Sequence, residues 1–137
     1  SSLVGSEMCI RDRLKTMAAP NLVNVSSIYG KTVGADLGTS IAAVLSNAGG
    51  SNKVFKINSI YVTNIDGSNS ADTTVQFYNG SGAFELAHTV PVPADSTLIV
   101  LGKDAPIYLE EGHSIRASAS AASDLQIVIS YEELDDA

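Results

Sequence analysis

Residues 53–65 read KVFKINSIYVTNI, the longest run of strand-forming residues in the chain. Phe55 and Ile57 share one parity in this run, whereas Ile60 and Val62 share the other. Successive side chains of a strand point to opposite faces, so apolar residues of both parities indicate a strand covered on both sides. We therefore predict a central strand here, with a β-bulge midway that swaps its two faces.

A hairpin is predicted directly downstream of this stretch. Residues 73–78 and 84–90 each alternate apolar and polar side chains, and residues 79–82 between them read NGSG. An Asn-Gly turn between two alternating runs is a strong hairpin signal, and we expect a turn of about four residues. Because proline has no N–H for a strand ladder, we expect Pro91 and Pro93 to end the second strand.

Further short strands are predicted on both sides of this hairpin. A Gly-rich connection is expected after the first of them, from Gly30 through Gly38. The apolar run within residues 40–46 also fits a short helix, but its shortness favours a strand. The remaining predicted strands cover residues 22–29, 40–46, 96–101, 107–109, 114–119 and 125–131. Without alternating helices, this pattern predicts an all-β antiparallel sandwich or jelly-roll of about eight strands.

The chain of 137 residues has the length of a single domain. We place that domain at residues 17–134 and expect an acidic tail over residues 135–137, with fraying from Glu132 onward. Residues 1–16 have neither strand alternation nor a helical face. The run MCIRDR at residues 8–13 resembles a translated transposon end used to build sequencing libraries. We interpret residues 1–16 as adapter read-through before a start at Met17; a natural disordered arm is the alternative.

The composition argues against several classes of function. Without residues 1–16 the chain keeps five basic and thirteen acidic side chains, a net charge of −8. Such a surface repels nucleic acid, which is bound by clustered Lys and Arg. No stretch approaches the roughly 18 apolar residues of a membrane span. The sole cysteine, Cys9, lies in the leader, so we expect no disulfide in the domain.

The sequence offers no set of residues typical of catalysis. A nucleophilic triad needs Ser, His and a carboxylate together, and the chain has two histidines, His88 and His113. We expect His88 to be a packed or edge residue of a strand, and His113 to be exposed after a turn. The pairs Glu110–Glu111 and Glu132–Glu133 are adjacent, so in a strand their side chains would point to opposite faces. We therefore assign no catalytic residue.

One loop faintly resembles a calcium site. Asp66, Ser68, Ser70 and Asp72 place oxygen ligands at alternate positions near a glycine. The spacing is not that of an EF-hand, and the bidentate Glu is missing. An ordinary polar turn explains these residues equally well, so a weak calcium site stays an open alternative. We assign no metal-ligating or cofactor-binding residue, and we expect no cofactor.

Five motifs carry a resemblance to a known group of proteins. They are the start at residues 17–21 (MAAPN), the run 53–64, the loop 91–97 (PVPADST), the turn 108–116 (YLEEGHSIR) and the ending 129–133 (ISYEE). Together the motifs resemble the small virion structural proteins of marine tailed phages. Each is a strand-and-turn pattern, which indicates architecture more than role.

The resemblance implies a non-enzymatic structural protein of the virion, assembled in the host cytoplasm. Capsid decoration is the leading expectation, and another head, neck or tail-associated subunit would act in the same way, through protein–protein interfaces. We expect a homo-oligomer, with a trimer as one arrangement, that contacts other virion proteins such as the major capsid protein. Leu22, Val23 and Val25 are candidates for apolar contact between copies. The alternative is a carbohydrate- or receptor-binding sandwich module of a tail or fibre, which predicts an exposed aromatic platform or a calcium site on the loops.

Overall fold

The computed structural model describes residues 25–102 and 104–135. These residues form nine β-strands and no helix, which confirms the predicted all-β class. None of the described residues therefore belongs to a helix of the length and hydropathy needed to cross a membrane. The strands are β1 (Ser27–Asp36), β2 (Ala42–Ser46), β3 (Lys53–Asn64), β4 (Ala71–Tyr78), β5 (Ala83–Val92), β6 (Thr97–Leu101), β7 (Ile107–Leu109), β8 (Ser114–Ala119) and β9 (Leu125–Asp135).

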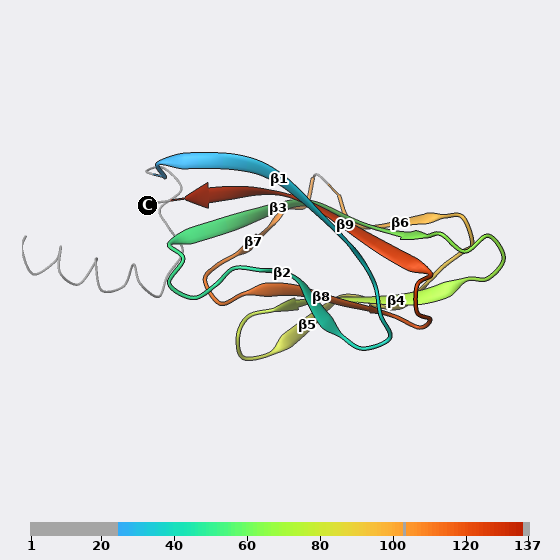
Figure 1. The fold of residues 1–137 in the computed structure, drawn as a ribbon. Coiled ribbons are helices and arrows are strands. Elements are labelled where there is room, and N and C mark those ends of the chain that lie inside the picture. The colour runs from blue at the N-terminus through green and yellow to red at the C-terminus, as the bar shows by residue number, and fades with distance from the viewer. Residues whose placement is uncertain (1–24, 103, 136–137) are drawn as a thin grey trace, which may run out of the picture.

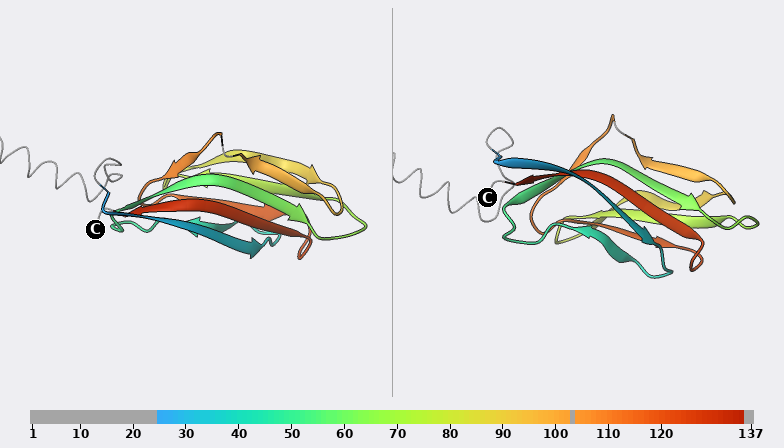
Figure 2. Two further views of the ribbon diagram at one scale, coloured as in Figure 1. Left: turned by 90° about the horizontal axis from the view of Figure 1, so that it is seen from above. Right: turned by 45° about the horizontal axis from the view of Figure 1, so that its top comes forward.

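The strands pair into two antiparallel sheets stacked as two layers (Figure 1). Sheet A has the order β1-β9-β3, and both β6 and β7 pair with the far edge of β3. Sheet B has the order β2-β8-β4-β5. Figure 2 shows β3, β9 and β1 side by side in one layer when the molecule is seen from above.

The strand order is that of a jelly-roll. β6 pairs with residues 60–63 of β3 and β7 with residues 55–57, so these two short strands fill one position of sheet A. The pairs then nest within one another along the chain: β4 with β5, β3 with β6 and β7, β2 with β8, and β1 with β9. Successive pairs alternate between the sheets, as in a doubled ribbon wound into a sandwich. The predicted jelly-roll is confirmed.

The central strand and its bulge are also confirmed. β3 lies between β9 on one side and β6 and β7 on the other, and its register against β9 shifts between Ile57 and Ser59. Before the shift Phe55 and Ile57 point into the core, and after it Ile60 and Val62 do. One inserted residue thus lets apolar side chains of both parities reach the same interior.

The core lies between the two sheets and is aliphatic. Each completely buried large side chain stabilises the fold by about 1.5–3 kcal/mol relative to an exposed one. The hydrophobic side chains with no exposed surface are Ile57, Ile60, Val62, Val75, Val92, Leu109, Ile115, Leu125, Ile127 and Ile129. Both sheets contribute to this set, so neither inner face can be stable in water alone.

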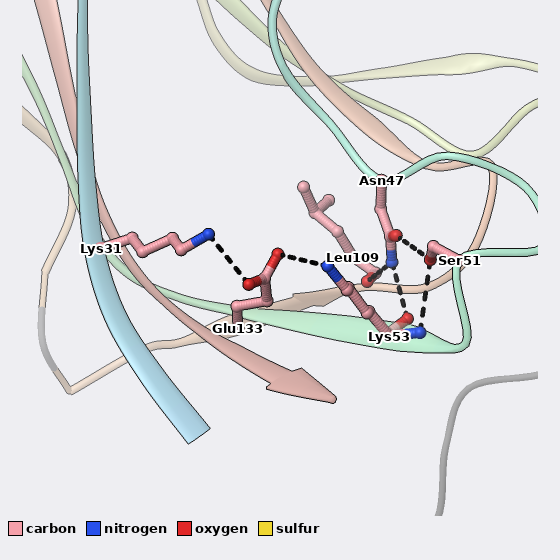
Figure 3. A network of polar contacts seen from close by, with 6 residues as sticks. All are labelled: Lys31, Asn47, Ser51, Lys53, Leu109 and Glu133. Carbon is pink, nitrogen blue, oxygen red and sulfur yellow. Dashed lines mark hydrogen bonds and ion pairs between the residues drawn. The ribbon is translucent and has the colours of Figure 1, made fainter. Parts of the chain in front are cut away.

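A buried asparagine holds one end of the sandwich together (Figure 3). Asn47 is 1% exposed, and its Nδ2 donates to the carbonyl oxygens of Lys53 at 2.8 Å and Leu109 at 3.0 Å. Its Oδ1 accepts from the hydroxyl of Ser51 at 2.6 Å. The amide therefore ties the end of β2 to the start of β3 and the end of β7.

The first strand differs from its prediction. β1 runs through Gly30 and Gly34, where a connection was expected, and residues 22–24 of the predicted strand lie outside the described residues. Its register against β9 is unbroken from Ser27 opposite Asp135 to Asp36 opposite Gln126. Ten consecutive partners on β9 outweigh the weak intrinsic preference of glycine for strands.

The end of the hairpin is a second correction. β5 does not stop at Pro91 but continues to Val92, which is completely buried. β5 is an edge strand of sheet B, so proline costs no ladder hydrogen bond where its missing N–H faces outward. The hairpin itself is confirmed, because β4 and β5 pair around a turn in which the Asn79 amide donates to the Gly82 carbonyl at 3.1 Å.

The acidic C-terminal segment does not fray within the described residues. β9 continues to Asp135, with Glu133 7% and Leu134 6% exposed. The expected fraying from Glu132 was wrong for the described residues, because β1 and β3 both pair with this segment. The predicted leader at residues 1–16 lies outside the described residues.

Candidate functional site

An apolar row crosses the outer face of sheet A, the face turned away from sheet B. In register across the sheet, Gly34 of β1 lies opposite Val128 of β9, Val128 opposite Tyr61 of β3, and Tyr61 opposite Ile99 of β6. Val128 is 39%, Tyr61 38% and Ile99 62% exposed. Tyr108 of β7 is exposed too, and it adds a further ring to the same face. Three neighbouring strands thus present large apolar side chains to solvent.

A shallow depression lies at the β1 end of this row. It has a volume of about 300 Å³ and is lined by β1 and β9 residues that include Gly34, Asp36, Gln126 and Val128. Gly34 has no side chain to fill it, and a Cβ placed there would meet Ile127 O at 3.7 Å, an ordinary contact distance. The missing side chain at this position therefore leaves part of the hollow open.

The row is bordered by polar groups that mostly lack charge. On one side Thr63 Oγ1 lies 3.1 Å from Thr97 Oγ1, and Gln126 Nε2 donates to Asp36 Oδ1 at 2.8 Å. An apolar centre with a polar rim is the usual anatomy of a protein–protein interface, whose core is poor in charge and rich in tyrosine.

The outer face of sheet B has a different character. Arg116 of β8 places its guanidinium carbon 3.5 Å from the ring centroid of Tyr78 on β4. Beside it, Gln76 Nε2 donates to Glu85 Oε1 at 2.9 Å, and His88 Nδ1 lies 3.7 Å from Glu85 Oε2. This face is polar and charged, as expected of a sheet that meets water on one side.

An ion-pair cluster occupies the end of the sandwich where both lysines reach Glu133 (Figure 3). Lys31 of β1 and Lys53 of β3 place their Nζ atoms 2.9 and 3.3 Å from the Glu133 carboxylate on β9. Burial alone would raise the pKa of Glu133, but hydrogen bonds and charge from the two lysines hold it below its ordinary value. The same hydrogen bond raises the pKa of Lys31. The cluster joins three strands of sheet A.

The two histidines have separate surroundings. His88 lies exposed on the edge strand β5, as predicted, beside Glu85. His113 is half-buried and not exposed, since its ring packs edge-on against Phe77 at 5.2 Å and its Nδ1 accepts from the Glu110 amide. The side-chain partners of the two histidines within residues 25–102 and 104–135 are thus separate, and they do not form a triad with a serine.

The two Glu-Glu pairs make structural contacts and do not form a catalytic dyad of carboxylates. Glu133 points inward to the two lysines, whereas Glu132 lies opposite Lys56 on the outer face, so the two diverge as predicted. Glu111 accepts from the backbone amides of Gly50 and Asn52 and so braces the loop between β2 and β3.

The candidate calcium loop folds as a turn around Asp66. Its Oδ1 accepts from the amides of Ser68 at 2.8 Å and Asn69 at 3.3 Å. The hydrogen bond from the Ser68 amide, and after it those from the side chain and amide of Asn69, lower the pKa of Asp66. No group of three or more His, Cys, Asp or Glu suited to a metal occurs among residues 25–102 and 104–135.

Sequence reasoning missed the apolar row. Tyr61 and Val128 are each flanked in the sequence by core residues, so their side chains point to the outer face, and Ile99 points outward from β6. Each therefore places an apolar side chain where a solvated outer face would carry a polar one. These apolar residues at outward-facing positions were the sequence signal that could have predicted the row. Of the apolar residues proposed instead, Leu22 and Val23 lie outside the described residues, and Val25 is half-buried.

Fold and face together define a jelly-roll sandwich domain with one apolar outer face. No family model matches the chain, and no curated protein matches it.

Solved structures show distant likenesses. A protein from work on Bacillus endospore appendages, described as disulfide-linked pili, is 16% identical with a TM-score of 0.48, over 81% of this chain and 90% of that one. A protein of the acid-stable capsid of Helicobacter pylori bacteriophage KHP30 is 7% identical with a TM-score of 0.47, over 82% and 91%. A pentameric capsid protein from metagenomic phage sequences is 14% identical with a TM-score of 0.33, over 85% and 68%.

Proposed function

We propose that this chain is a non-enzymatic structural subunit of a marine tailed-phage particle, assembled in the host cytoplasm and acting through protein–protein contacts. Capsid decoration is the role we favour among particle-associated roles. The observation that carries the proposal is the apolar row Val128, Tyr61 and Ile99 on the outer face of sheet A. An outer sheet face that only meets water would be polar, whereas apolar exposure in neighbouring strands marks a contact surface.

The assignment to a phage particle is supported by the five sequence motifs that resemble small virion structural proteins of marine tailed phages. A jelly-roll also suits the role mechanically, because its nested strand pairs place the first and last strands, β1 and β9, side by side in one sheet. In sheet A, β1 and β9 lie side by side, so a force on one end segment is shared by ten paired residues.

Self-association of the purified full chain tests the proposal. We expect light scattering to report an oligomer and electron microscopy to show particles of uniform size. We also expect the chain to sediment with tailed-phage heads assembled from a major capsid protein. A strict monomer that does not bind heads would contradict the proposal.

A second candidate function is carbohydrate or receptor binding. The observation that favours it is the Tyr78–Arg116 pair on the outer face of sheet B, with Gln76 and Glu85 next to it. Aromatic rings and hydrogen-bonding side chains on one face are features of sugar sites. A glycan array with the full chain separates this function from the first.

A further inference from the structure

The outer face of sheet A carries a projection and a hollow in the same row. Ile99, the most exposed large hydrophobic side chain described, stands on β6 at one edge of the sheet. The depression at Gly34 lies on β1 at the opposite edge. Tyr61 and Val128 lie between them in register. From this arrangement we infer that two copies of the chain pack sheet A against sheet A, with Ile99 of each copy seated in the Gly34 depression of the other.

A two-fold axis makes this geometry self-consistent. The axis runs parallel to the strands, in the space between the two sheet A faces, and passes midway between the positions of Tyr61 and Val128. Rotation about it places the strands of the second copy in the opposite order across the interface. Ile99 of one copy then faces Gly34 of the second copy, and Tyr61 faces Val128. Both contacts occur twice, as an isologous interface requires. Since strands lie about 4.8 Å apart, the four positions match over a row about 14 Å long.

The hollow has the size that the projection needs. Its volume of about 300 Å³ is at the lower limit of the pockets that hold small ligands, so it accommodates one aliphatic side chain. An Ile99 side chain seated in the hollow would contact the Val128 side chain and the backbone of Ile127. The Gln126–Asp36 hydrogen bond lies at the rim of the hollow.

The charge distribution permits a second copy as the occupant that the match of projection and hollow points to. The chain carries a formal net charge of −7, so two copies repel one another wherever their acidic surfaces meet. The four residues of the row are uncharged, and the nearest carboxylate in the lining, Asp36, already accepts a hydrogen bond from Gln126. A basic partner would be drawn to acidic surface, and the only carboxylate in the lining of the hollow, Asp36, is already hydrogen-bonded.

This inference rests on the proposed function, since it names the partner that a self-assembling subunit uses. Two substitutions in the full chain test it by light scattering. Ile99→Asp removes the projection and adds a charge, and Gly34→Leu fills the hollow, where added atoms meet ordinary contact distances. We expect each to lower the dimer affinity at least tenfold. The matched controls are Phe84→Asp, an exposed apolar residue on β5, and Gly38→Leu, an open glycine after β1, and both should leave the affinity unchanged.

Crosslinking tests the symmetry directly. In a Cys9→Ser background, the double variant Gly34→Cys with Ile99→Cys should form covalent dimers under oxidation. Each intermolecular disulfide forms from two thiols, whose two electrons are accepted by oxidised glutathione. An equimolar mixture of the two single variants should form them as well, whereas each single variant alone should stay uncrosslinked. A ladder of trimers and larger species would indicate a head-to-tail contact and overturn the inference.

The outcomes separate the two proposals. If the wild-type chain associates but Ile99→Asp and Gly34→Leu associate equally well, the inferred contact is wrong and the proposed function stands. If the wild-type chain is a monomer and does not bind phage heads, both fail. Circular dichroism of each variant shows that a lost affinity reflects the interface rather than an unfolded chain.

Discussion

The Nζ of Lys31 lies 2.9 Å from Oε2 of Glu133, and this ion pair ties the edge strand β1 to the end of β9. The Glu133 side chain is 9% exposed, whereas that of Lys31 is 46% exposed. Lys53 of β3 approaches the other oxygen of the same carboxylate at 3.3 Å. One largely buried carboxylate therefore holds two lysines from different strands and balances part of their charge.

Replacement of this carboxylate should destabilise the domain. Glu133→Gln keeps the shape but removes the charge, so two ammonium groups face each other without a counter-ion. Both lysines reach water, so we expect a loss of about 1–2 kcal/mol, between the values for exposed and buried pairs. Chemical denaturation measures this loss. Glu132→Gln, one residue earlier on the outer face, is the control and should change stability by less than half as much.

The pH dependence of stability should follow from the same carboxylate. Its pKa is lower in the folded chain than the ordinary value of 4.5, so its contribution is complete above that value and disappears as the pH falls through the folded-state pKa. Glutamine does not titrate. The difference in melting temperature between the wild type and Glu133→Gln should thus be constant above about pH 6 and shrink towards pH 3. A constant difference down to pH 3 would show that the lysines do not shift this pKa.

Substitution of Asn47 should lower the free energy of unfolding more than substitution of most other polar residues. Asn47→Ala would leave the carbonyls of Lys53 and Leu109 without their side-chain donor at the buried end of β2. We expect a loss of about 2–3 kcal/mol from two broken hydrogen bonds and the desolvated acceptors they leave. Urea denaturation measures it. Ser46→Ala, at the exposed neighbouring position, is the control; equal losses in the two variants would exclude this role for the amide.

The bulge in β3 should be essential for folding. Deletion of Asn58, between the residues where the register shifts, would turn Ile60 and Val62 to the outer face or force β9 to slip. Either outcome exposes side chains that are completely buried, so we expect loss of the cooperative unfolding transition. The control is deletion of Gly49 in the loop between β2 and β3, where the chain has room to adjust. A folded, cooperative chain without Asn58 would show that the register tolerates the change.

The elements predicted correctly are those in which local pattern and final environment agree. The double parity of residues 53–65 reflects the bulge between Ile57 and Ser59, and NGSG at residues 79–82 forms the predicted turn. The strand order of the jelly-roll could be predicted only as a class, because alternation says which face is buried but not which strand is adjacent.

The missed elements depend on partners distant in the sequence. Gly30 and Gly34 are in a strand because β9, almost a hundred residues later, pairs with them. The end of β9 pairs with β1 and β3, and its Glu133 meets Lys31 and Lys53 there, contacts that no local window of sequence contains. The apolar row is similar, since Tyr61, Ile99 and Val128 come together only once three strands are aligned.

The outer face of sheet B gives a test of the carbohydrate alternative. The Arg116 guanidinium covers one face of the Tyr78 ring at 3.5 Å, so that face is occupied by the protein itself. If the pair is structural, Arg116→Ala should cost about 0.5–1 kcal/mol of stability, the value of an exposed cation–π contact, and a glycan array should be blank for both wild type and variant. A sugar-binding face predicts the reverse: glycan signal with the wild type, and its loss in Tyr78→Ala without unfolding. Signal of that kind would transfer the functional surface from sheet A to sheet B.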